Sequence, residues 1–540
     1  PDRTRSTLKG LKRNHHYTIQ QPLEPDAPTD SQLHSKLEIS TPSVFSDASD
    51  RLNHISSRAF SDDFVRQPLL PYALSHHGPG LVCMDFDGDG ITDVLIGGEH
   101  GQQPTIHYGR SNGEFESKEL EYRFRNDSAG MLGMVVPGGR VHLFAGQSGY
   151  EIPQQPALME LNLQGQYRSL FSNILSGIGP MAAGPLHGEG GLSAFLGGSY
   201  QSRQYPLTHP SRLLHQDGTG WRVDESHDAL LTAVHRARSA VWSDLNGDGL
   251  PELIIATEWG PIRVFQNTKG RLEDRTGEWG VDSFTGLWSG VVTGDMDGNG
   301  YPDLIVGNWG RNSPWRASVD RPLTLYHGDL LKTDVRDLIE TEYHENGTIA
   351  PSRSLTELGS SLPFLFQQSV SYKHFGSLSA REHFSGYLNE LETLEVSTLD
   401  SCLFLNTGKG SFKRVVLPDE VQWAPVFGLQ VGDFNGDGVE DLILGQNQSH
   451  VREGMPPQNQ GGALLLEGRG DGEFLVLDNE ASGLNIRGDI RGLALADFDQ
   501  DGRLDCVMTQ NEGATKVYLN QATSKPGLRV RLKNVSKNPH

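Results

Sequence analysis

The sequence predicts an all-β fold: a seven-bladed β-propeller that carries a helical insertion in its fifth blade. A nine-residue Asp/Gly loop recurs five times, and each copy runs directly into an apolar, strand-like segment. The same unit surrounds the intact loops: an apolar run enters the loop, and three further strand-like runs follow. A repeated four-stranded unit of roughly 50 residues is typical of a propeller blade.

The repeated loop has the chemistry of a site for a hard cation. Its first copy reads Asp85-Phe-Asp-Gly-Asp-Gly-Ile-Thr-Asp93, and further copies begin at Asp244, Asp295, Asp433 and Asp497. Side-chain oxygens stand at positions 1, 3, 5 and 9, and the glycine at position 6 permits the positive φ of a tight turn. Ca²⁺ takes six to eight oxygen ligands, so a backbone carbonyl at position 7 would complete the set.

The pattern therefore predicts about five Ca²⁺ ions, one for each loop. Without a cation, the clustered carboxylates of each loop would repel one another. The predicted ligands, with position 7 contributing its carbonyl oxygen, are Asp85, Asp87, Asp89, Ile91 and Asp93; Asp244, Asn246, Asp248, Leu250 and Glu252; Asp295, Asp297, Asn299, Tyr301 and Asp303; Asp433, Asn435, Asp437, Val439 and Asp441; and Asp497, Asp499, Asp501, Arg503 and Asp505.

Two other kinds of loop share part of this pattern. An EF-hand requires a Glu at loop position 12 and a helix after the loop. Position 12 is apolar in all five copies, so the EF-hand interpretation fails; the residues are Ile96, Ile255, Val306, Leu444 and Met508. The remaining alternative is an Asp/Gly-rich turn that binds no metal.

The composition excludes some partners and favours a compartment. The chain has 540 residues and a formal net charge of -22, from 46 Lys and Arg against 68 Asp and Glu, which argues against nucleic-acid binding. No apolar run is long enough to cross a membrane. Because Ca²⁺ loops of modest affinity are most useful outside the cytosol, we expect an extracellular, periplasmic or cell-surface location. The three cysteines, Cys83, Cys402 and Cys506, lie in or beside apolar runs and indicate buried free thiols.

The order of segments along the chain supports the blade count. Residues 1–34 are polar and predict a disordered leader, and 35–526 predict the propeller, with an extended stretch at 64–75. Residues 133–146 and 184–198 are two copies of the unit that have lost the acidic ligands, so we expect blades without metal there. Loop starts then fall at 85, 134, 185, 244, 295, 433 and 497, which gives seven blades.

The long step from 295 to 433 predicts an insertion at about 311–400. A hairpin is expected at 322–343, with a further degenerate loop at Asp329–Asp337, and residues 353–395 carry apolar side chains at helical spacing. Ser379 and Glu382 fit a helical capping box. The alternative is that the hairpin begins an eighth blade. Residues 527–540 begin a new basic strand and predict the truncated start of a further domain.

The Asp loops and the strands that follow them resemble the FG-GAP/VCBS repeats of integrin-α-like propellers. More narrowly, residues 40–540 resemble the cartilage-acidic-protein/UnbV (ASPIC) group, on four stretches: Gln67–Ser75, Glu258–Ile262, Gly307–Asn312 and Leu528–Asn538. The last stretch resembles the start of an ASPIC/UnbV domain. The resemblance implies a secreted or surface propeller, stabilised by calcium, with no assigned catalysis.

The search for catalytic motifs leaves two functions open. The metalloprotease motif His-Glu-x-x-His and the nucleophile elbow Gly-x-Ser-x-Gly are absent, and His76-His77 is the histidine pair that stands out. Trp259 and Trp309, at matching repeat positions, either line a ligand surface or pack between blades. The favoured function is non-catalytic binding of a protein or a glycan. The alternative is an extracellular enzyme that acts on polysaccharide in the propeller channel, which would need convergent titratable groups beside a pocket.

Overall fold

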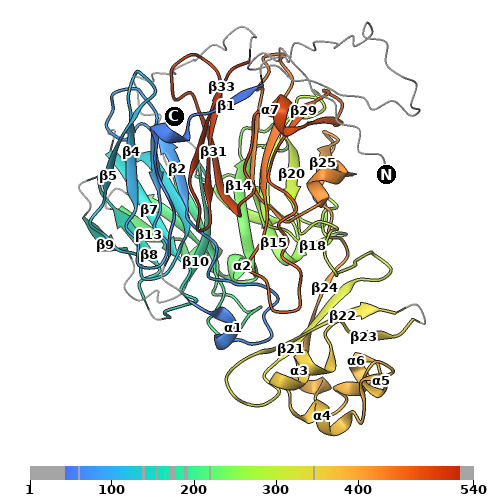
Figure 1. The fold of residues 1–540 in the computed structure, drawn as a ribbon. Helices are drawn as coiled ribbons and strands as arrows, with labels where there is room; N and C mark the ends of the chain where they lie inside the picture. Colours follow the sequence, from blue (N-terminus) through green and yellow to red (C-terminus); the bar gives the residue numbers. More distant parts are fainter. Residues whose placement is uncertain are drawn as a thin grey trace, which may run out of the picture.

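The computed structural model describes residues 43–522, except for gaps at 59–60, 137–139, 154, 164–165, 171–176, 188–191, 218–219 and 345–346 (Figure 1). The predicted leader at 1–34 and the predicted tail domain at 527–540 therefore lie outside the described residues. The described chain is all-β, and its strands form antiparallel sheets. No helix among these residues is long and apolar enough to cross a membrane.

Seven sheets each present one strand to a common centre. From the centre outward, the first three sheets are β2 (Leu81–Met84), β3 (Asp93–Ile96), β4 (Thr105–Gly109) and β5 (Phe115–Glu119); β6 (Ser128–Val136), β7 (Arg140–Gln147), β8 (Leu158–Leu161) and β9 (Tyr167–Ser169); and β10 (Ile178–Gly184), β11 (Ser193–Gly198), β12 (Arg212–Asp217) and β13 (Gly220–Val223). The fourth sheet is β14 (Ala237–Ser243), β15 (Glu252–Pro261), β16 (Arg263–Asn267) and β17 (Leu272–Asp274), with β18 (Thr285–Leu287) paired to the far part of β15. The last three sheets are β19 (Gly290–Gly294), β20 (Asp303–Gly307), β25 (Cys402–Asn406) and β26 (Phe412–Val416); β27 (Val426–Gly432), β28 (Asp441–Gln446), β29 (Ala463–Gly468) and β30 (Phe474–Leu477); and β31 (Ile490–Ala496), β32 (Asp505–Gln510), β33 (Lys516–Asn520) and β1 (Phe45–Asp47).

The innermost strands pack against one another in a series that returns to its start. β2 contacts β6, β6 contacts β10, and the contacts continue through β14, β19, β27 and β31 back to β2. Sheets that pack around an axis in this way form a β-propeller. The apolar residues of the strands fill the space between neighbouring sheets, as Ile254, Trp288 and Phe404 do between two of them.

The sheet at the end of the chain is completed by the beginning of the described chain. β1 pairs antiparallel with β33, and Phe45 lies opposite Asn520. Strand pairing between the two ends of a propeller joins its last sheet to its first segment and leaves fewer exposed edges.

The insertion between β20 and β25 differs from the predicted helical segment. It contains a four-stranded sheet in the order β23-β22-β21-β24, besides helices. The predicted hairpin is present as the pair β21 and β22, and the capping box of Ser379 and Glu382 is present at α6. The elements of the insertion are β21 (Leu323–Gly328), β22 (Asp337–Tyr343), β23 (Ile349–Pro351), α3 (Leu355–Ser361), α4 (Phe364–Gln368), α5 (Tyr372–Phe375), α6 (Ala380–His383), η3 (Leu388–Glu390) and β24 (Glu392–Val396).

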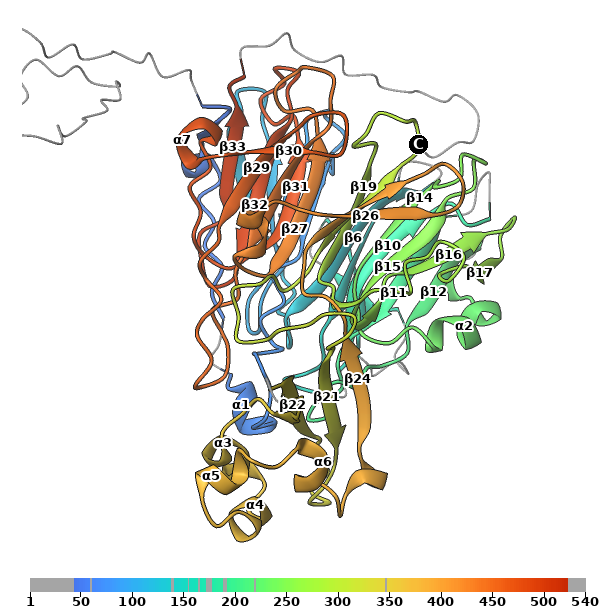
Figure 2. The same ribbon diagram turned by 90° about the vertical axis from the view of Figure 1, so that its right-hand side faces the viewer.

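The insertion projects from one end of the ring of sheets. Figures 1 and 2 both show β21, β22 and the helices α3–α6 below the other sheets. β24 is the strand that packs against the ring, at β15 and β18. β20 pairs directly with β25, so the insertion leaves the sheet that carries it intact.

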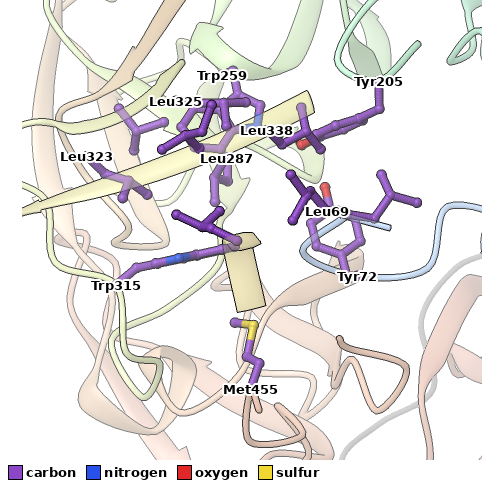
Figure 3. Close-up of a cluster of buried hydrophobic side chains, with 14 of the residues drawn as sticks. Leu69, Tyr72, Tyr205, Trp259, Leu287, Trp315, Leu323, Leu325, Leu338 and Met455 are labelled. Atoms are coloured by element: carbon purple, nitrogen blue, oxygen red, sulfur yellow. Dashed lines mark hydrogen bonds between the residues drawn. The ribbon is translucent and has the colours of Figure 1, made fainter. Parts of the chain in front are cut away.

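A large apolar cluster joins the insertion to the propeller (Figure 3). Trp259 and Trp309 belong to it and are 2% and 4% exposed, so they pack in the interior and are not surface residues. Tyr72, Trp315 and Leu338 come from three other segments and complete the contact. The two tryptophans are therefore buried, but they pack between the propeller and the insertion and not between blades as predicted.

The segment predicted to be extended at 64–75 begins with a helical turn. This turn is α1 (Asp63–Arg66), and the carboxylate of Asp62 accepts hydrogen bonds from the N–H groups of Phe64 and Val65. The buried carboxylate of Asp63 accepts two further backbone N–H bonds at 2.7 Å, from Leu74 and Ser75. Asp62 favours the turn because it satisfies N–H groups that a first helical turn leaves free, and Asp63 ties the turn to the far end of the segment.

The remaining helices are short and cover the ends of sheets. They are η1 (Ser49–Arg51), η2 (Glu225–His227), α2 (Asp228–Thr232), η4 (Asp419–Gln422) and α7 (Asn479–Ser482). The three cysteines form no disulfide, and Cys402 and Cys506 are buried while Cys83 is half-buried.

Candidate metal sites in the aspartate loops

The five Asp loops occupy equivalent places in five sheets. Each loop connects the innermost strand of its sheet to the second strand, as Asp85–Asp93 connects β2 to β3. The first and second strands are antiparallel in every case, so the five loops lie at the same end of the propeller. The insertion lies at the opposite end, because it follows a second strand.

The carboxylate at position 1 closes each loop by a hydrogen bond. In the first loop, Oδ2 of Asp85 accepts the backbone N–H of Gly90 at 2.9 Å. The same bond recurs at 2.8 Å from Gly249 to Asp244, at 2.9 Å from Gly300 to Asp295, at 2.9 Å from Gly438 to Asp433 and at 3.2 Å from Gly502 to Asp497. Position 6 has a positive φ in all five loops, which explains its glycine; the values are 94°, 81°, 87°, 86° and 85°.

The side chains at positions 3 and 5 turn inward in the same way. In the first loop, Asp87 accepts the N–H of Asp89 at 3.2 Å, and Asp89 accepts the N–H of Ile91 at 2.8 Å. Both bonds recur in the other four loops. Each oxygen-bearing side chain at positions 3 and 5 is thus held by the backbone N–H two residues on.

The acid at position 9 fastens the loop to the sheet. Asp93 is buried, and its two oxygens accept the N–H of Phe86 at 2.7 Å and of Gly109, at the end of β4, at 2.9 Å. Asp303, Asp441 and Asp505 make the same pair of bonds to position 2 and to the end of the third strand. Glu252 makes the same bond to position 2, Leu245, but its other oxygen accepts the side-chain amide of Asn246 and not a third-strand N–H. These carboxylates have a structural role whether or not a cation is bound.

The acid at position 9 of each loop has a raised pKa. Burial raises the pKa of each, and the neighbouring loop carboxylates raise it further. The pKa is about 6 for Asp93, Asp303 and Asp441 and about 7 for Glu252 and Asp505. A cation in the loop would offset this repulsion and favour the ionised form.

Three of the loops bring three carboxylate oxygens within 4.8 Å of one another. The sets are Asp85, Asp87 and Asp93; Asp295, Asp297 and Asp303; and Asp497, Asp499 and Asp501. The loops at 244 and 433 carry Asn at position 3, and within the described residues they form no set of three carboxylates at that distance. In the last loop, Oδ1 of Asp497 is buried without a hydrogen-bond partner in the described structure. Oxygen donors at this spacing fit Ca²⁺.

In two loops an arginine lies close to the carboxylates. Arg110 lies 3.6 Å from Asp87 and 3.8 Å from Asp89, and Arg503 pairs with Asp501. These guanidinium groups supply part of the positive charge that a cation would otherwise supply. The sequence did not indicate the first pair, because Arg110 follows β4 and lies outside the loop.

The residues at position 7 contribute their N–H groups to the loop, each to the side chain at position 5. Their carbonyl oxygens remain predicted ligands; the residues are Ile91, Leu250, Tyr301, Val439 and Arg503.

The degenerate loop Asp329–Asp337 keeps the loop form without the full set of oxygens. Asp329 accepts the N–H groups of Thr333 and Asp334 at 2.9 Å, and Asp337 accepts that of Leu330 at 3.0 Å. Positions 3 and 4 are Leu331 and Lys332. The loop form therefore does not by itself establish a cation site, and the oxygens at positions 3 and 5 are what distinguishes the five candidates.

The two copies predicted to lack metal have the expected strands. Residues 133–146 fall in β6 and β7, and 184–198 in β10 and β11, but the loop residues 137–139 and 188–191 lie outside the described part of the chain.

Sequence reasoning did not identify a second feature, two adjoining cavities in the centre of the ring. Their volumes are about 140 Å³ and 200 Å³. His77, Arg238 and Arg491 line both, and Tyr200 lines the first. Arg238 contacts the His77 ring at 3.2 Å and lies 4.0 Å from Glu258. These residues are far apart in the sequence, which is why no local motif revealed them.

Comparison with known proteins supports the repeat interpretation. Residues 210–306, which contain the loops Asp244–Glu252 and Asp295–Asp303, match the FG-GAP-like repeat family. Cartilage acidic protein 1 of Xenopus tropicalis is 21% identical over 406 residues, which are 68% of this chain and 57% of the relative. The chain thus matches little more than half of that relative's length.

Two similar solved structures are of BBS1N in complex with ARL6DN, one soaked with mercury and one with lead. They are 9% and 10% identical, with TM-scores of 0.42 and 0.33, and each comparison covers 90% of this chain and 99% of the other. Because both TM-scores are below 0.5, the fold assignment rests on the strand pairing of this chain itself.

Proposed function

We propose that this chain is a seven-bladed, Ca²⁺-stabilised propeller that acts outside the cytosol and binds another protein or a glycan without catalysis. The observation that carries the proposal is the hydrogen-bond pattern that all five Asp loops share. It fixes the oxygen-bearing side chains at positions 1, 3 and 5 of each loop, and in three of the loops three carboxylate oxygens lie within 4.8 Å of one another, where a hard cation would find several ligands at once.

The blade count is supported by the circular series of innermost strands. Seven sheets take part in that series, and the sheet of the insertion packs beside β15 and β18 instead. The alternative of eight blades would require β21 or another strand of the insertion to lie between two neighbours of the series. We therefore favour seven blades with the insertion in the fifth.

Calcium would act mainly on stability. Each loop concentrates acids whose repulsion opposes folding, and a bound cation that the unfolded chain binds weakly shifts the equilibrium toward the folded state. The proposed ligands are the oxygens at positions 1, 3, 5, 7 and 9 of the five loops, with the position-9 acid already fixed by backbone N–H groups. About five ions per chain are expected.

The location follows from the same chemistry. Sites of modest Ca²⁺ affinity would be filled where the ion is plentiful, outside the cytosol. The name of the relative, a cartilage acidic protein, agrees with that location and with the acidic composition of this chain.

The insertion offers a surface for a partner. Val370 and Tyr372 are 88% and 66% exposed, and Phe366, on α4, is 49% exposed. Exposed aromatic side chains often anchor partners. Because the insertion projects from the ring, its tip is accessible to a macromolecule (Figure 2).

The enzymatic alternative predicts convergent titratable groups in the channel. The cavities there are lined by two arginines and a histidine, and Glu258 is the carboxylate beside them. Hydrolysis of a glycosidic bond ordinarily uses two carboxylates across the scissile bond. Since the described cavity lining contains no carboxylate, binding is the better supported function.

Binding and catalysis can be separated by one comparison. The full chain, immobilised in Ca²⁺, would be tested against arrays of extracellular proteins and glycans and assayed for release of reducing ends from acidic and neutral polysaccharides. We expect a ligand that is retained without turnover and whose binding weakens in a Val370→Ser, Tyr372→Ser variant. Release of reducing ends that an Arg238→Ala variant abolishes would favour the enzyme instead.

A further inference from the structure

Three loops from different sheets bring two histidines and a glutamate together, away from the Asp loops. His76 precedes β2, His450 lies between β28 and β29, and Glu512 lies between β32 and β33. One ligand atom from each lies within 4.8 Å of the other two. All three come from the end of the sheets opposite the Asp loops, because they follow second strands or precede a first strand.

His450 is oriented by carboxylates on both sides of its ring. Its Nε2 lies 3.3 Å from Oε2 of Glu512, and its Nδ1 lies 3.7 Å from Oδ2 of Asp489. Asp489 is fixed in turn by the backbone N–H of Ser449 at 2.9 Å and by its hydroxyl at 2.7 Å. A carboxylate behind one ring nitrogen is the arrangement that directs the other nitrogen toward a metal.

His76 presents a nitrogen that has no partner. The residue is 6% exposed, and its Nδ1 is buried without a hydrogen-bond partner among the described residues. Its backbone is fixed, because its carbonyl oxygen accepts Nε of Arg491 at 3.0 Å and Nδ2 of Asn511 at 3.2 Å. A buried polar nitrogen without a partner costs free energy, and a metal ion would satisfy it.

We propose that His76, His450 and Glu512 form a binding site for a divalent transition-metal ion of the Zn²⁺ type. Two imidazoles and one carboxylate are a ligand set that suits Zn²⁺, whereas Ca²⁺ prefers oxygen alone. Three protein ligands leave a fourth position for water or for a group of a partner molecule.

As the two histidine rings stand, they do not point at one shared cation, so binding requires a change of ring orientation. The two imidazole rings stack, with centroids 3.8 Å apart and planes at 28°. Joint ligation requires the rings to tilt toward one ion. The His450 side chain is 37% exposed, and the last torsion of a histidine side chain is broad, so the His450 ring can rotate. Arg491 lies 3.5 Å from Asp489, so its charge is offset by that carboxylate.

The site would connect segments that the chain places far apart. His76 belongs to the segment that leads into the first sheet, while His450 and Glu512 belong to the last two sheets. A metal ion here would cross-link the beginning of the ring to its end. This site is independent of the Ca²⁺ proposal, because it uses other residues and another class of metal.

Titration calorimetry of the full chain with Zn²⁺, in excess Ca²⁺ to saturate the Asp loops, tests the site. The variants are His450→Ala and Glu512→Gln, both at partly exposed side chains, which avoids disturbing the buried His76. The matched control is His344→Ala, because His344 is also 37% exposed and lies 3.6 Å from a single carboxylate, Glu342. Melting temperatures in Ca²⁺ confirm that each variant is folded.

We expect one tight Zn²⁺ equivalent in the wild type and in His344→Ala, with an affinity at least about ten-fold weaker in both site variants. Zn²⁺ should also raise the melting temperature of the wild type but not that of the site variants. The proposal is overturned if the wild type binds no such equivalent, or if all four proteins bind Zn²⁺ alike.

Discussion

The carboxylate of Asp303 accepts the backbone N–H of Asn406 at 2.7 Å, across 103 positions of the sequence. The equivalent bonds join Asp93 to Gly109 and Asp505 to Asn520 over 16 and 15 positions. The same contact therefore holds a sheet together whether a short turn or the whole insertion separates its second and third strands. The side chain of Asn406 extends the contact to the neighbouring sheet, because its Nδ2 donates to the carbonyl of Leu245 at 2.8 Å.

Replacement of Asp303 should destabilise the chain even without calcium. Asp303→Ala leaves the N–H groups of Met296 and Asn406 without their acceptor, which should cost about 2–4 kcal/mol of the free energy of unfolding. Denaturant unfolding in EGTA measures this, with the exposed Asp320→Ala as control. A loss seen only in Ca²⁺ would mean that Asp303 acts as a metal ligand alone.

The last Asp loop carries strain that glycine should relieve. Gln500 has a φ of 61° at position 4, where the other four loops have glycine. A left-handed conformation costs a non-glycine residue about 1–2 kcal/mol, so Gln500→Gly should stabilise the protein by roughly 1 kcal/mol after the added entropy of the unfolded chain is subtracted. Unfolding of Gln500→Gly and Gln500→Ala in parallel tests this. Equal stability of the two variants would contradict it.

The degenerate loop Asp329–Asp337 should accept a new Ca²⁺ site. It already has the turn and the acids at positions 1 and 9, and Leu331 at position 3 is 40% exposed. Leu331→Asp, Lys332→Gly, Thr333→Asp and Asp334→Gly together restore the oxygens at positions 3 and 5 and the glycines at positions 4 and 6. Metal analysis after dialysis should find one additional Ca²⁺ per chain. An unchanged metal content in the folded variant would show that the loop pattern is insufficient.

Stability should depend on pH through Glu258. Burial raises the pKa of Glu258 from 4.5 to about 8, while Tyr200 and Tyr205 donate hydrogen bonds to it. The folded state therefore keeps a proton that the unfolded state releases above pH 4.5, so stability falls as the pH rises from there to about 8. The slope is at most about 1.4 kcal/mol per pH unit.

Glu258→Gln removes this contribution and should make the pH profile of unfolding less steep between pH 5 and 8, where the five position-9 acids still titrate. The comparison is made at constant Ca²⁺. Parallel profiles of the variant and the wild type would show that Glu258 is ionised across the range.

Much of the fold could be predicted because its signals are local. The pattern Asp-x-Asx-x-Asx followed by an apolar run predicted all five loops and the strands on either side of them. The capping box of Ser379 and Glu382 predicted the start of a helix. β23 and β24 were not predicted, because a three-residue strand and a solvent-exposed strand have little apolar pattern.

The parts of the candidate sites that were missed depend on contacts between distant segments. Nothing in the sequence near Arg110 shows that it reaches Asp87, and nothing near His450 shows that it stacks on His76. His76 stood out only as one of an adjacent pair. Its partners became evident once the ring of sheets brought three loops together.

Thermal unfolding in excess Ca²⁺ and in EGTA, together with the metal content of the dialysed protein, tests the central claim most directly. We expect about five Ca²⁺ per chain and a large fall of the melting temperature in EGTA, because the loop carboxylates then repel one another. Equal melting temperatures and no retained metal would mean that the five loops are hydrogen-bonded turns without calcium.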